Sequence, residues 1–513
     1  MLEQTVAQVR WLSVSVSTGA RSKPHLKASG IFVNDVVAMQ NAVVELMRIS
    51  PLAEELAERF AKAGHRLYLV GGSVRDALLG RPSSDLDFTT DARPDRVLKI
   101  VSEWGDAVWD VGIAFGTVGV TKKGMQLEIT TFRADSYDGV TRNPEVTFGE
   151  TIEGDLLRRD FTVNAMAIDL ASKTFIDPHD GFHALREKVL DTPATPQESF
   201  SDDPLRMLRA ARFSAQLGFV AAPRVVEAMT SMADEIDRIT AERVQTELSK
   251  LLLADDPQPG LELLVDTGLG DRVIPEVPGM RLAIDEHHQH KDVYQHSLTV
   301  LAQAIDLETS HEPASGPDLI LRLAALLHDV GKPETREFQP GGGVSFHHHE
   351  VVGARMARKR LRALKFSKEI VDDVSQLVFL HLRFHGYGKG EWTDSAVRRY
   401  VTDAGPLLTR LHKLVRADCT TRNKRKAAAL QATYDDLEAR ISALKAQEDL
   451  DRVRPDLNGE QIMELLSLKP GPDVGKAWKF LKELRLDRGP LPHDDAVAEL
   501  KRWAAENGIG DPA

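Results

Sequence analysis

Two aspartates separated by a single residue, Asp85 and Asp87, are the first candidates for chemistry in this chain. Side chains on a strand alternate between its two faces, so both carboxylates are expected on one face. Carboxylates at this spacing can hold Mg²⁺ between the protein and phosphate oxygens. The pattern therefore predicts metal-assisted transfer of a phosphoryl or nucleotidyl group.

The residues before this pair are suited to binding phosphate. The apolar run Leu67–Val70 predicts a strand, which leads into Gly71, Gly72 and Ser73 and then into a helical pattern that includes Arg75. Two glycines allow a tight turn with exposed N–H groups, and a helix that begins there adds its positive end, so the turn suits a triphosphate. Taken singly, a Gly-Gly turn or an Asp-x-Asp pair is more often a plain turn or cap.

Two further blocks carry clustered arginines. Arg158 and Arg159 precede Asp160 and Asn164, a set that can grip phosphates and a ribose hydroxyl, with a capped surface turn as the alternative. In the third block, acidic and basic side chains recur at a spacing of three residues and share one helix face: Asp203, Arg206, Arg209 and Arg212. The alternatives for this block are a simple salt-bridge stripe and an N-cap aspartate that precedes the helix.

A separate set of imidazoles and carboxylates lies more than 200 residues after Asp87. Leu319–Leu327 predicts an apolar helix that ends in His328 and Asp329, and neighbours of this kind at a helix end can reach one divalent ion. The full candidate set is His296, His328, Asp329, His349, His381 and Asp418. Imidazole ligands suit a divalent transition metal, with Mg²⁺ as the alternative.

The first three blocks, GGSVRD…DLD, RRDFTVNA and DDPLRMLRAARF, resemble the class II tRNA nucleotidyltransferase and poly(A) polymerase family of the polymerase-β superfamily. The resemblance implies that Asp203 and Arg206 read the Watson–Crick edge of the incoming base. Asp202 stands where the family usually has glutamate. Glu128, in EITTFR, matches a segment between the first two motifs and is the candidate third carboxylate; an exposed hairpin glutamate is the alternative.

The second set resembles the HD superfamily of metal-dependent phosphohydrolases. His296, His328, Asp329 and Asp418 fill its H…HD…D pattern, and His349 and His381 match extra ligands in HD phosphodiesterases. Among three consecutive histidines, the HE…GA spacing favours His349. A folded HD domain whose metal does little chemistry is the alternative.

Composition narrows the class of protein. The chain has 513 residues, a formal net charge of −12 and one cysteine. That length predicts several domains, and a single cysteine excludes an intrachain disulfide and fits a reducing cytosol. No apolar run reaches the roughly 18 residues that span a bilayer, so we expect a cytoplasmic protein without a membrane partner. An acidic chain needs local basic surface to bind RNA, and 355–365 and 398–426 are candidates.

The expected fold class is α+β. A small mixed α/β head, with a hairpin that joins 115–121 to 126–132, precedes largely helical neck, HD and tail domains. The expected divisions are a disordered arm and helix start at 1–47, a head at 48–190, a neck at 191–284, an HD domain at 285–430 and a tail at 431–513.

Together, the two resemblances imply a bacterial CCA-adding tRNA nucleotidyltransferase that uses CTP, ATP and Mg²⁺. The alternatives are a poly(A) polymerase, a partial CC- or A-adding enzyme, and an HD hydrolase whose head only senses nucleotides.

Overall fold

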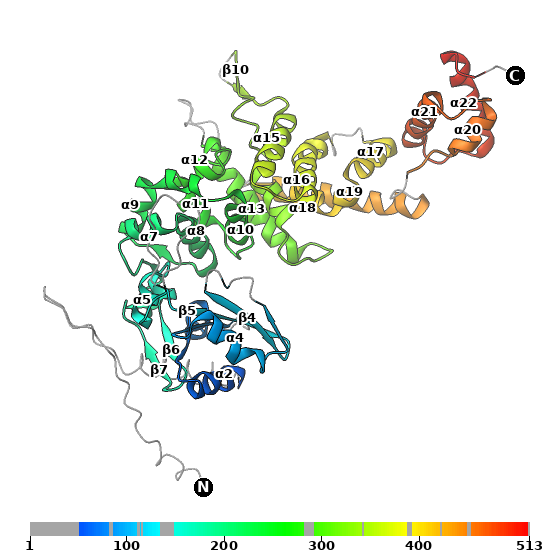
Figure 1. Ribbon diagram of the computed structural model, residues 1–513. Helices are drawn as coiled ribbons and strands as arrows, with labels where there is room; N and C mark the ends of the chain where they lie inside the picture. Colours follow the sequence, from blue (N-terminus) through cyan, green and yellow to red (C-terminus); the bar gives the residue numbers. More distant parts are fainter. Residues whose placement is uncertain are drawn as a thin grey trace, which may run out of the picture. The chain divides into compact units, whose positions relative to one another are not determined.

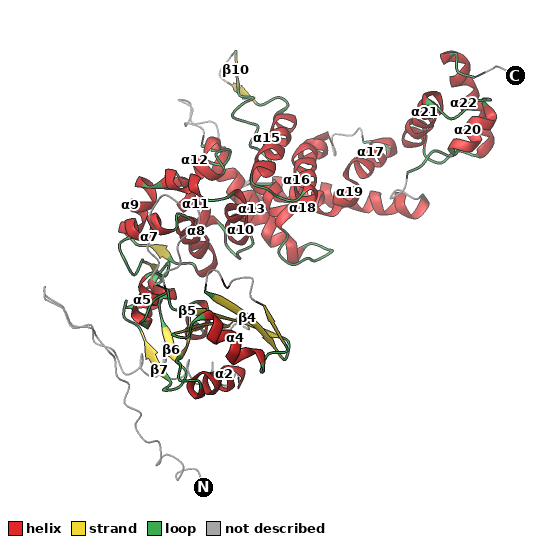
Figure 2. Cartoon of the chain, viewed as in Figure 1, coloured by secondary structure: helices red, strands yellow, loops and turns green. Residues whose placement is uncertain are grey.

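The computed structural model has the expected α+β architecture, with one mixed sheet and many helices (Figure 2). It describes residues 51–81, 86–109, 113, 116–133, 148–281, 292–340, 343–386, 392–420, 423–448 and 453–510. The chain divides into two compact units, Met1–Glu247 with Pro259–Arg272, and Leu248–Gln258 with Val273–Ala513. The expected arm and the helix start before residue 51 lie outside the described residues, as does Asp85.

A seven-stranded sheet forms the centre of the first unit (Figure 1). Its strand order is β3-β4-β5-β2-β1-β6-β7, and β2 and β5 are parallel while the other neighbours are antiparallel. The seven strands are β1 (Leu67–Val70), β2 (Leu86–Thr90), β3 (Ala107–Trp109), β4 (Thr117–Lys122), β5 (Met125–Thr131), β6 (Ala167–Asp169) and β7 (Thr174–Ile176).

Two predicted local features are confirmed. The strand expected at Leu67–Val70 is β1, and the expected hairpin is β4 and β5 joined through Lys123 and Gly124. Both turn residues have positive φ, 51° and 78°, which matches the right-handed twist of a hairpin. The β-branched residues of this hairpin favour strands because they pack well on a pleated surface.

Each face of the sheet has its own core. The face that carries Leu69, Phe88 and Ile129 packs against two helices, α2 (Pro51–Lys62) and α4 (Pro94–Ser102). The opposite face carries Tyr68 and Val70 and packs against α5 (Ile152–Leu157). Because side chains alternate along a strand, polar residues next to Phe88 and Ile129 must point to this second face.

The remaining regular elements of the first unit are mostly helical. They are α3 (Gly72–Leu78), the 3₁₀ helix η2 (Thr162–Asn164), α6 (Gly181–Glu187), α7 (Pro196–Asp202), α8 (Leu205–Leu217), α9 (Pro223–Ser231), η3 (Ala233–Arg238), α10 (Ala241–Leu252, which continues into the second unit), α11 (Gln258–Asp266) and α12 (Leu269–Val273). A short parallel pair, β8 (Val189–Leu190) and β9 (Val220–Ala221), lies beside α8.

The second unit is almost entirely helical. Its helices are η4 (Pro278–Met280), α13 (Val293–Ser310), α14 (Leu319–Leu327), α15 (His349–Ala363), α16 (Lys368–Leu380), η5 (His381–Gly386), α17 (Asp394–Ala404), η6 (Gly405–Leu407), α18 (Leu408–Ala417), α19 (Lys424–Gln447), α20 (Gly459–Leu465), α21 (Pro472–Arg488) and α22 (His493–Asn507). The helix predicted at Leu319–Leu327 is α14, and α20 to α22 share a separate apolar core.

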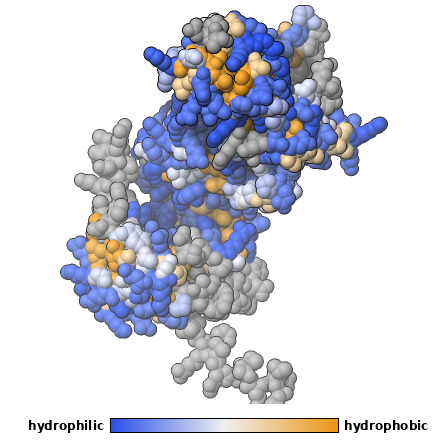
Figure 3. Space-filling view, turned by 90° about the vertical axis from the view of Figure 1, so that its right-hand side faces the viewer, coloured by the Kyte–Doolittle hydropathy of each residue, from blue (hydrophilic) through white to orange (hydrophobic). Residues whose placement is uncertain are grey.

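Strands also occur where the sequence predicted almost none. Beyond residue 199 the structure has β9 and a hairpin of β10 (Glu337–Gln339) and β11 (Gly343–Ser345). These strands have two or three residues each, so they carry no alternation that a sequence pattern could reveal. The view in Figure 3 shows a mainly hydrophilic surface with apolar side chains gathered in a few patches. Among the described helices, none combines the length and the apolar character that crossing a membrane requires.

Candidate active site and metal centre

Asp87 and Glu128 lie side by side on the parallel strands β2 and β5. Their Cα atoms are register partners, and both residues are exposed, on the face of the sheet opposite α2 and α4. Glu128 therefore lies on the strand next to the one that carries Asp87. The two carboxylates come from different segments, and their spacing is set by the pairing of the strands.

The glycine turn is next to Asp87. Gly71 has φ +72°, and a Cβ built on it would lie 3.8 Å from Asp87 Oδ2 and 3.0 Å from Arg159 Nη1. The amide of Asp87 donates to Ser73 Oγ at 3.2 Å. A side chain at position 71 would thus crowd the carboxylate and the guanidinium, and its backbone would be strained as well.

Arg75 joins the first sequence block to the second. It is buried on α3, where Nη1 donates to Asn164 Oδ1 at 2.6 Å, and Nε and Nη2 donate to Asp76 at 2.8 and 2.9 Å. The amide of Asn164 donates in turn to Asp160 Oδ1 at 3.0 Å. Arg75, Asn164 and Asp160 were each predicted as nucleotide-binding residues, and the structure brings them into one hydrogen-bonded chain.

Asp160 continues this chain to the third block. Its Oδ2 accepts from Nε and Nη2 of Arg209 on α8, at 2.8 and 2.5 Å. Burial on its own would raise the pKa of this carboxyl, but the Arg209 guanidinium and the Asn164 amide hold the pKa well below its usual range. Asp160 is therefore a buried, ionised anchor between the head and α8.

Arg158 and Arg159 share one carboxylate that the sequence analysis overlooked. Asp155 is fully buried, and it accepts from Arg158 Nε at 3.1 Å and from Arg159 Nη2 at 3.0 Å. Burial opposes its ionisation, yet the two guanidiniums lower its pKa. A signal for this residue existed, because Asp155 precedes the arginines by three and four positions in a helical segment.

The two residues implied in base reading have protein partners. Asp203 accepts from Arg243 Nη2 at 2.8 Å through Oδ2 and from the Leu205 amide at 3.1 Å through Oδ1. Arg206 donates to Ser199 Oγ at 2.8 Å and to the Arg158 carbonyl. Burial lowers the pKa of Arg206, although Asp160 acts in the opposite direction.

Arg212 is the most buried of the three arginines on α8. Its Nε lies 2.7 Å from Oε2 of Glu247 on α10, and burial lowers the pKa of Arg212 to about 10. Glu247 and Arg243 are both absent from the predicted site. They sit on a helix some 35 residues away, so no local spacing marked them as partners of the third block.

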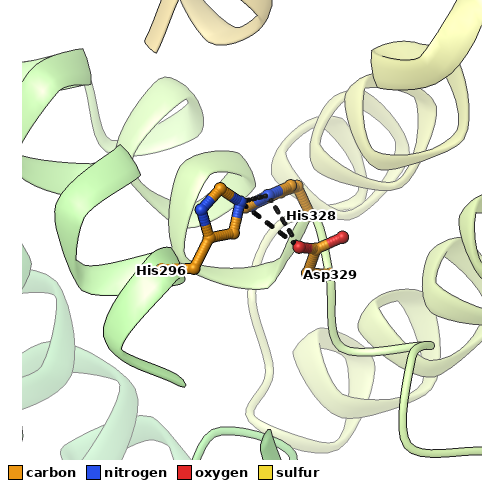
Figure 4. Close-up of side chains that lie close together, drawn as sticks. All are labelled: His296, His328 and Asp329. Carbon is orange, nitrogen blue, oxygen red and sulfur yellow. Dashed lines mark hydrogen bonds and ion pairs between the residues drawn. The ribbon is translucent and has the colours of Figure 1, made fainter. Parts of the chain in front are cut away.

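The second unit brings all six predicted imidazoles and carboxylates together. His296 Nε2 and His328 Nε2 lie 3.4 and 3.2 Å from Asp329 Oδ2, as Figure 4 shows. On the other carboxylate oxygen, Oδ1, His349 Nε2 lies at 3.2 Å and His381 Nε2 at 3.9 Å.

Asp329 is therefore common to two groups of potential ligands. Asp418 Oδ1 completes the set, 3.0 Å from His296 Nε2 and 3.7 Å from His328 Nε2.

The imidazoles are arranged as metal ligands require. Nδ1 of His328, His349 and His381 bonds to the carbonyls of Ala325, Phe346 and Val378, at 2.8, 2.8 and 2.6 Å. A neutral imidazole that donates from Nδ1 to a carbonyl carries its lone pair on Nε2, and Nε2 of His349 and of His381 faces Asp329. Within the part of the chain that the structure describes, Nε2 of His349 and of His381 is buried and makes no hydrogen bond. The donor set thus fits a divalent cation.

The environment keeps His381 neutral. Burial, together with the positive charge of His328, lowers the pKa of His381 to about 3, and a neutral imidazole is the ligating form. His349 is buried, whereas the side chain of its neighbour His348 is 83% exposed. Two contacts were not predicted: Lys332 Nζ lies 2.6 Å from Asp329 Oδ2, and Thr420 Oγ1 lies 3.2 Å from His296 Nδ1.

Three family models match consecutive parts of the chain. They are a poly A polymerase head domain at 67–191, a probable RNA and SrmB-binding site of polymerase A at 218–280, and an HD domain at 293–441. The chain is thus a nucleotidyltransferase that carries an HD domain.

Relatives agree over nearly the whole length. A CCA-adding enzyme of Anoxybacillus flavithermus is 30% identical over 460 residues, which cover 89% of this chain and 96% of that protein. An A-adding tRNA nucleotidyltransferase of Deinococcus radiodurans is 33% identical over 449 residues, 85% and 95% of the two chains. The crystal structure of a Bacillus stearothermophilus CCA-adding enzyme in complex with CTP has a TM-score of 0.63 at 25% identity and covers 92% of this chain and 98% of that chain.

The chain belongs to the CCA-adding enzyme family of nucleotidyltransferases. Nucleotidyltransferase heads and HD domains are generally metal-dependent, in agreement with the clustered side chains described above.

Proposed function

We propose that this protein adds C, C and A to the 3′ end of tRNA, using CTP and ATP without a nucleic-acid template and releasing pyrophosphate. The observation that carries the proposal is the register of Asp87 and Glu128 beside the Gly71 turn. Two carboxylates next to a phosphate-binding turn match the needs of nucleotidyl transfer better than those of nucleotide sensing, which requires no acidic pair. The near full-length relatives support the same reaction.

In this proposal, Asp85 and Asp87 would hold Mg²⁺, and the ion would neutralise negative charge on the oxygens of the triphosphate and of the transferred group. Glu128 lies opposite Asp87 and polarises the attacking 3′-hydroxyl of the tRNA. The N–H groups of Gly71, Gly72 and Ser73 bind the phosphates. Glycine is favoured at position 71 because its φ of +72° is a backbone conformation that other residues rarely adopt.

Arg75, Arg158 and Arg159 supply positive charge around this turn. Asn164 orients Arg75, and Asp160 orients Arg209 on α8. Arg209 and Arg212 extend the same electrostatic surface along α8. Because these cations are tied to Asp155, Asp160 and Glu247, little reorganisation is needed when a triphosphate binds.

Base selection is assigned to Asp203 and Arg206. A carboxylate accepts from the exocyclic amino group that cytosine and adenine share, and a guanidinium donates to a ring nitrogen or carbonyl. Both side chains have protein partners, Arg243 for Asp203 and Ser199 for Arg206. Binding of a base therefore exchanges these bonds for bonds to the nucleotide.

Partial addition is the main alternative to full CCA addition, because one near full-length relative is an A-adding enzyme. The decisive assay supplies CTP alone, ATP alone, or both to a tRNA that ends before CCA. Extension by three nucleotides with both substrates, and by two with CTP alone, is the expected result. Extension only with ATP, only on a tRNA that already ends in CC, would establish partial addition, and long homopolymers would indicate a poly(A) polymerase.

The six-residue cluster favours a second activity, hydrolysis of phosphoesters by the HD domain. Asp329 presents one oxygen to His296 and His328 and the other to His349 and His381, so the set offers ligands on both sides of a shared carboxylate. Imidazoles and carboxylates together suit a divalent transition metal better than Mg²⁺. Metal analysis, with phosphatase and cyclic phosphodiesterase assays on the purified protein, tests this activity.

We retain the division into a head at 48–190, a neck at 191–284, an HD domain at 285–430 and a tail at 431–513 as part of the proposal. The last boundary falls within α19, so that helix links the HD domain to the tail core of α20 to α22. The tRNA substrate also leads us to place the protein in the cytoplasm.

A further inference from the structure

Phe213, on α8, meets all three sequence blocks of the transferase site. Its side chain is buried, with 4% of its surface exposed. The guanidinium carbons of Arg75, Arg209 and Arg212 lie 5.2, 5.5 and 4.3 Å from its ring centroid. Arg75 comes from the first block and the other two arginines from the third.

The second block also contacts this ring. Phe161, which directly follows Asp160, is fully buried, and its ring meets that of Phe213 edge to face, with the centroids 5.8 Å apart and the planes at 89°. This geometry places the positive edge of one ring against the negative face of the other. The Phe213 side chain thus lies at the meeting point of three elements: α3, α8, and the segment that follows α5.

Three guanidiniums around one ring repel one another unless nearby negative charge offsets their positive charge. Each has a carboxylate neighbour: Asp76 for Arg75, Asp160 for Arg209, and Glu247 for Arg212. The ring adds an attraction of another kind, since its negative face attracts cations and that attraction grows where water is excluded. Unlike a further carboxylate, the ring carries no net charge that would repel an anionic ligand.

We propose that Phe213 is a positioning residue for nucleotide binding, and that the negative face of its ring holds the guanidiniums of Arg75, Arg209 and Arg212 in the orientation that a triphosphate requires. This inference rests on the proposed function, because it assumes that these arginines bind the nucleotide. Phe213 itself touches no reacting atom.

The test replaces Phe213 with phenylalanine bearing one, two or three ring fluorines in the full-length protein. Fluorine withdraws electron density, so each step weakens the attraction for cations while the ring changes little in size. We expect the Kd of ATP and the Kd of inorganic triphosphate to rise stepwise, by about two- to five-fold over the series, while kcat stays constant. The KM values for CTP and ATP should rise in parallel.

Phe161 is the matched control. It shares the ring–ring contact, but among the described residues no guanidinium is placed over its ring. The same fluorination there should leave the Kd of triphosphate unchanged. Phe213→Leu keeps an apolar side chain and removes the ring, and it should raise both Kd values at least as much as the trifluorinated ring does.

The outcomes separate the possibilities. If fluorination of Phe213 leaves both Kd values unchanged and only Phe213→Leu raises them, the ring merely fills space. That result would overturn the inference. An equal increase for fluorinated Phe161 would overturn it too. If the unmodified protein fails to extend tRNA, the proposed function is wrong, whereas the binding series for ATP and triphosphate still tests the role of the ring.

Discussion

Asp87 on β2 and Glu128 on β5 are register partners in the parallel pair of the seven-stranded sheet. They are separated by 40 residues of sequence that build β3 and β4 and return along β5. Parallel neighbours present equivalent positions to the same face, so the two carboxylates project on one side. The catalytic proposal depends on this relationship, and five predictions about the two sites can be checked.

Asp87→Ala should nearly abolish nucleotide addition. The change removes an oxygen ligand from the ion that balances charge on the transferred phosphate, and a loss of this kind costs about 10²–10³ in rate. The measurement is kcat for tRNA extension with Mg²⁺. Glu103→Ala removes an exposed carboxylate at the end of α4 and is the control, expected to be fully active. If Asp87→Ala kept half of the wild-type turnover, the catalytic assignment would be wrong.

Glu128→Gln should lower kcat while the KM of CTP stays close to that of the wild type. Glutamine keeps the size of the side chain but cannot polarise the attacking hydroxyl, and general-base assistance is worth about 10²–10⁴ in rate. Gln126→Ala, an exposed change two positions earlier on β5, serves as the control. A rise in KM with unchanged kcat would assign Glu128 to nucleotide binding instead.

Asp203→Ala should reduce discrimination against UTP and GTP more than it reduces the overall rate. A good bidentate base contact gives about 1–3 kcal/mol of discrimination. Competition between CTP and UTP on the same tRNA measures the change. Asp203 also accepts from the Leu205 amide at the start of α8, so the competing explanation is a structural role as a helix cap. That role is distinguished by an unchanged base preference at lower activity.

His349→Ala should weaken binding of transition metal and remove any phosphatase or phosphodiesterase activity, and His348→Ala should do neither. The two positions are adjacent, but His349 is buried against Asp329 and His348 is exposed. Metal content and hydrolysis are measured on both variants. His328→Ala and Asp329→Ala should behave like His349→Ala. CCA addition with Mg²⁺ should survive in all of them, and its parallel loss without unfolding would show that the two sites are coupled.

Asp160→Asn should destabilise the protein at neutral pH and leave it less sensitive to acid. The folded pKa of Asp160 is depressed below its unfolded value. Its contribution to stability is therefore fully present above the unfolded pKa of about 4, and it is lost as the pH falls through the lower folded pKa. The free energy of unfolding should differ from that of the wild type by about 1–3 kcal/mol at pH 7.

Denaturant titrations of both proteins between pH 7 and pH 2.5 test this prediction, and the difference should shrink as the pH falls. If the difference in free energy of unfolding stayed constant over this pH range, the charge on Asp160 would contribute nothing to stability.

Local patterns were sufficient for much of this protein. The strand Leu67–Val70, the hairpin through Gly124 and the helix Leu319–Leu327 follow from short-range preferences of the backbone, and the structure has all three. The HD ligands could be named because their motif fixes residue types at known spacing. The register of Glu128 with Asp87, by contrast, required the sheet to assemble, because pairing in a sheet joins segments that no local periodicity connects.

Tertiary structure alone decided the long-range partners of the charged residues. Glu247 meets Arg212, Arg243 meets Asp203, and Phe213 meets Arg75 through the packing of α8, α10 and α3. At these separations, sequence spacing carries no information. Burial then determined their chemistry, since a carboxylate such as Asp160 stays ionised inside the protein only when guanidiniums and amides surround it. Residue type specified which chemistry was available, and folding specified which of those groups face one another.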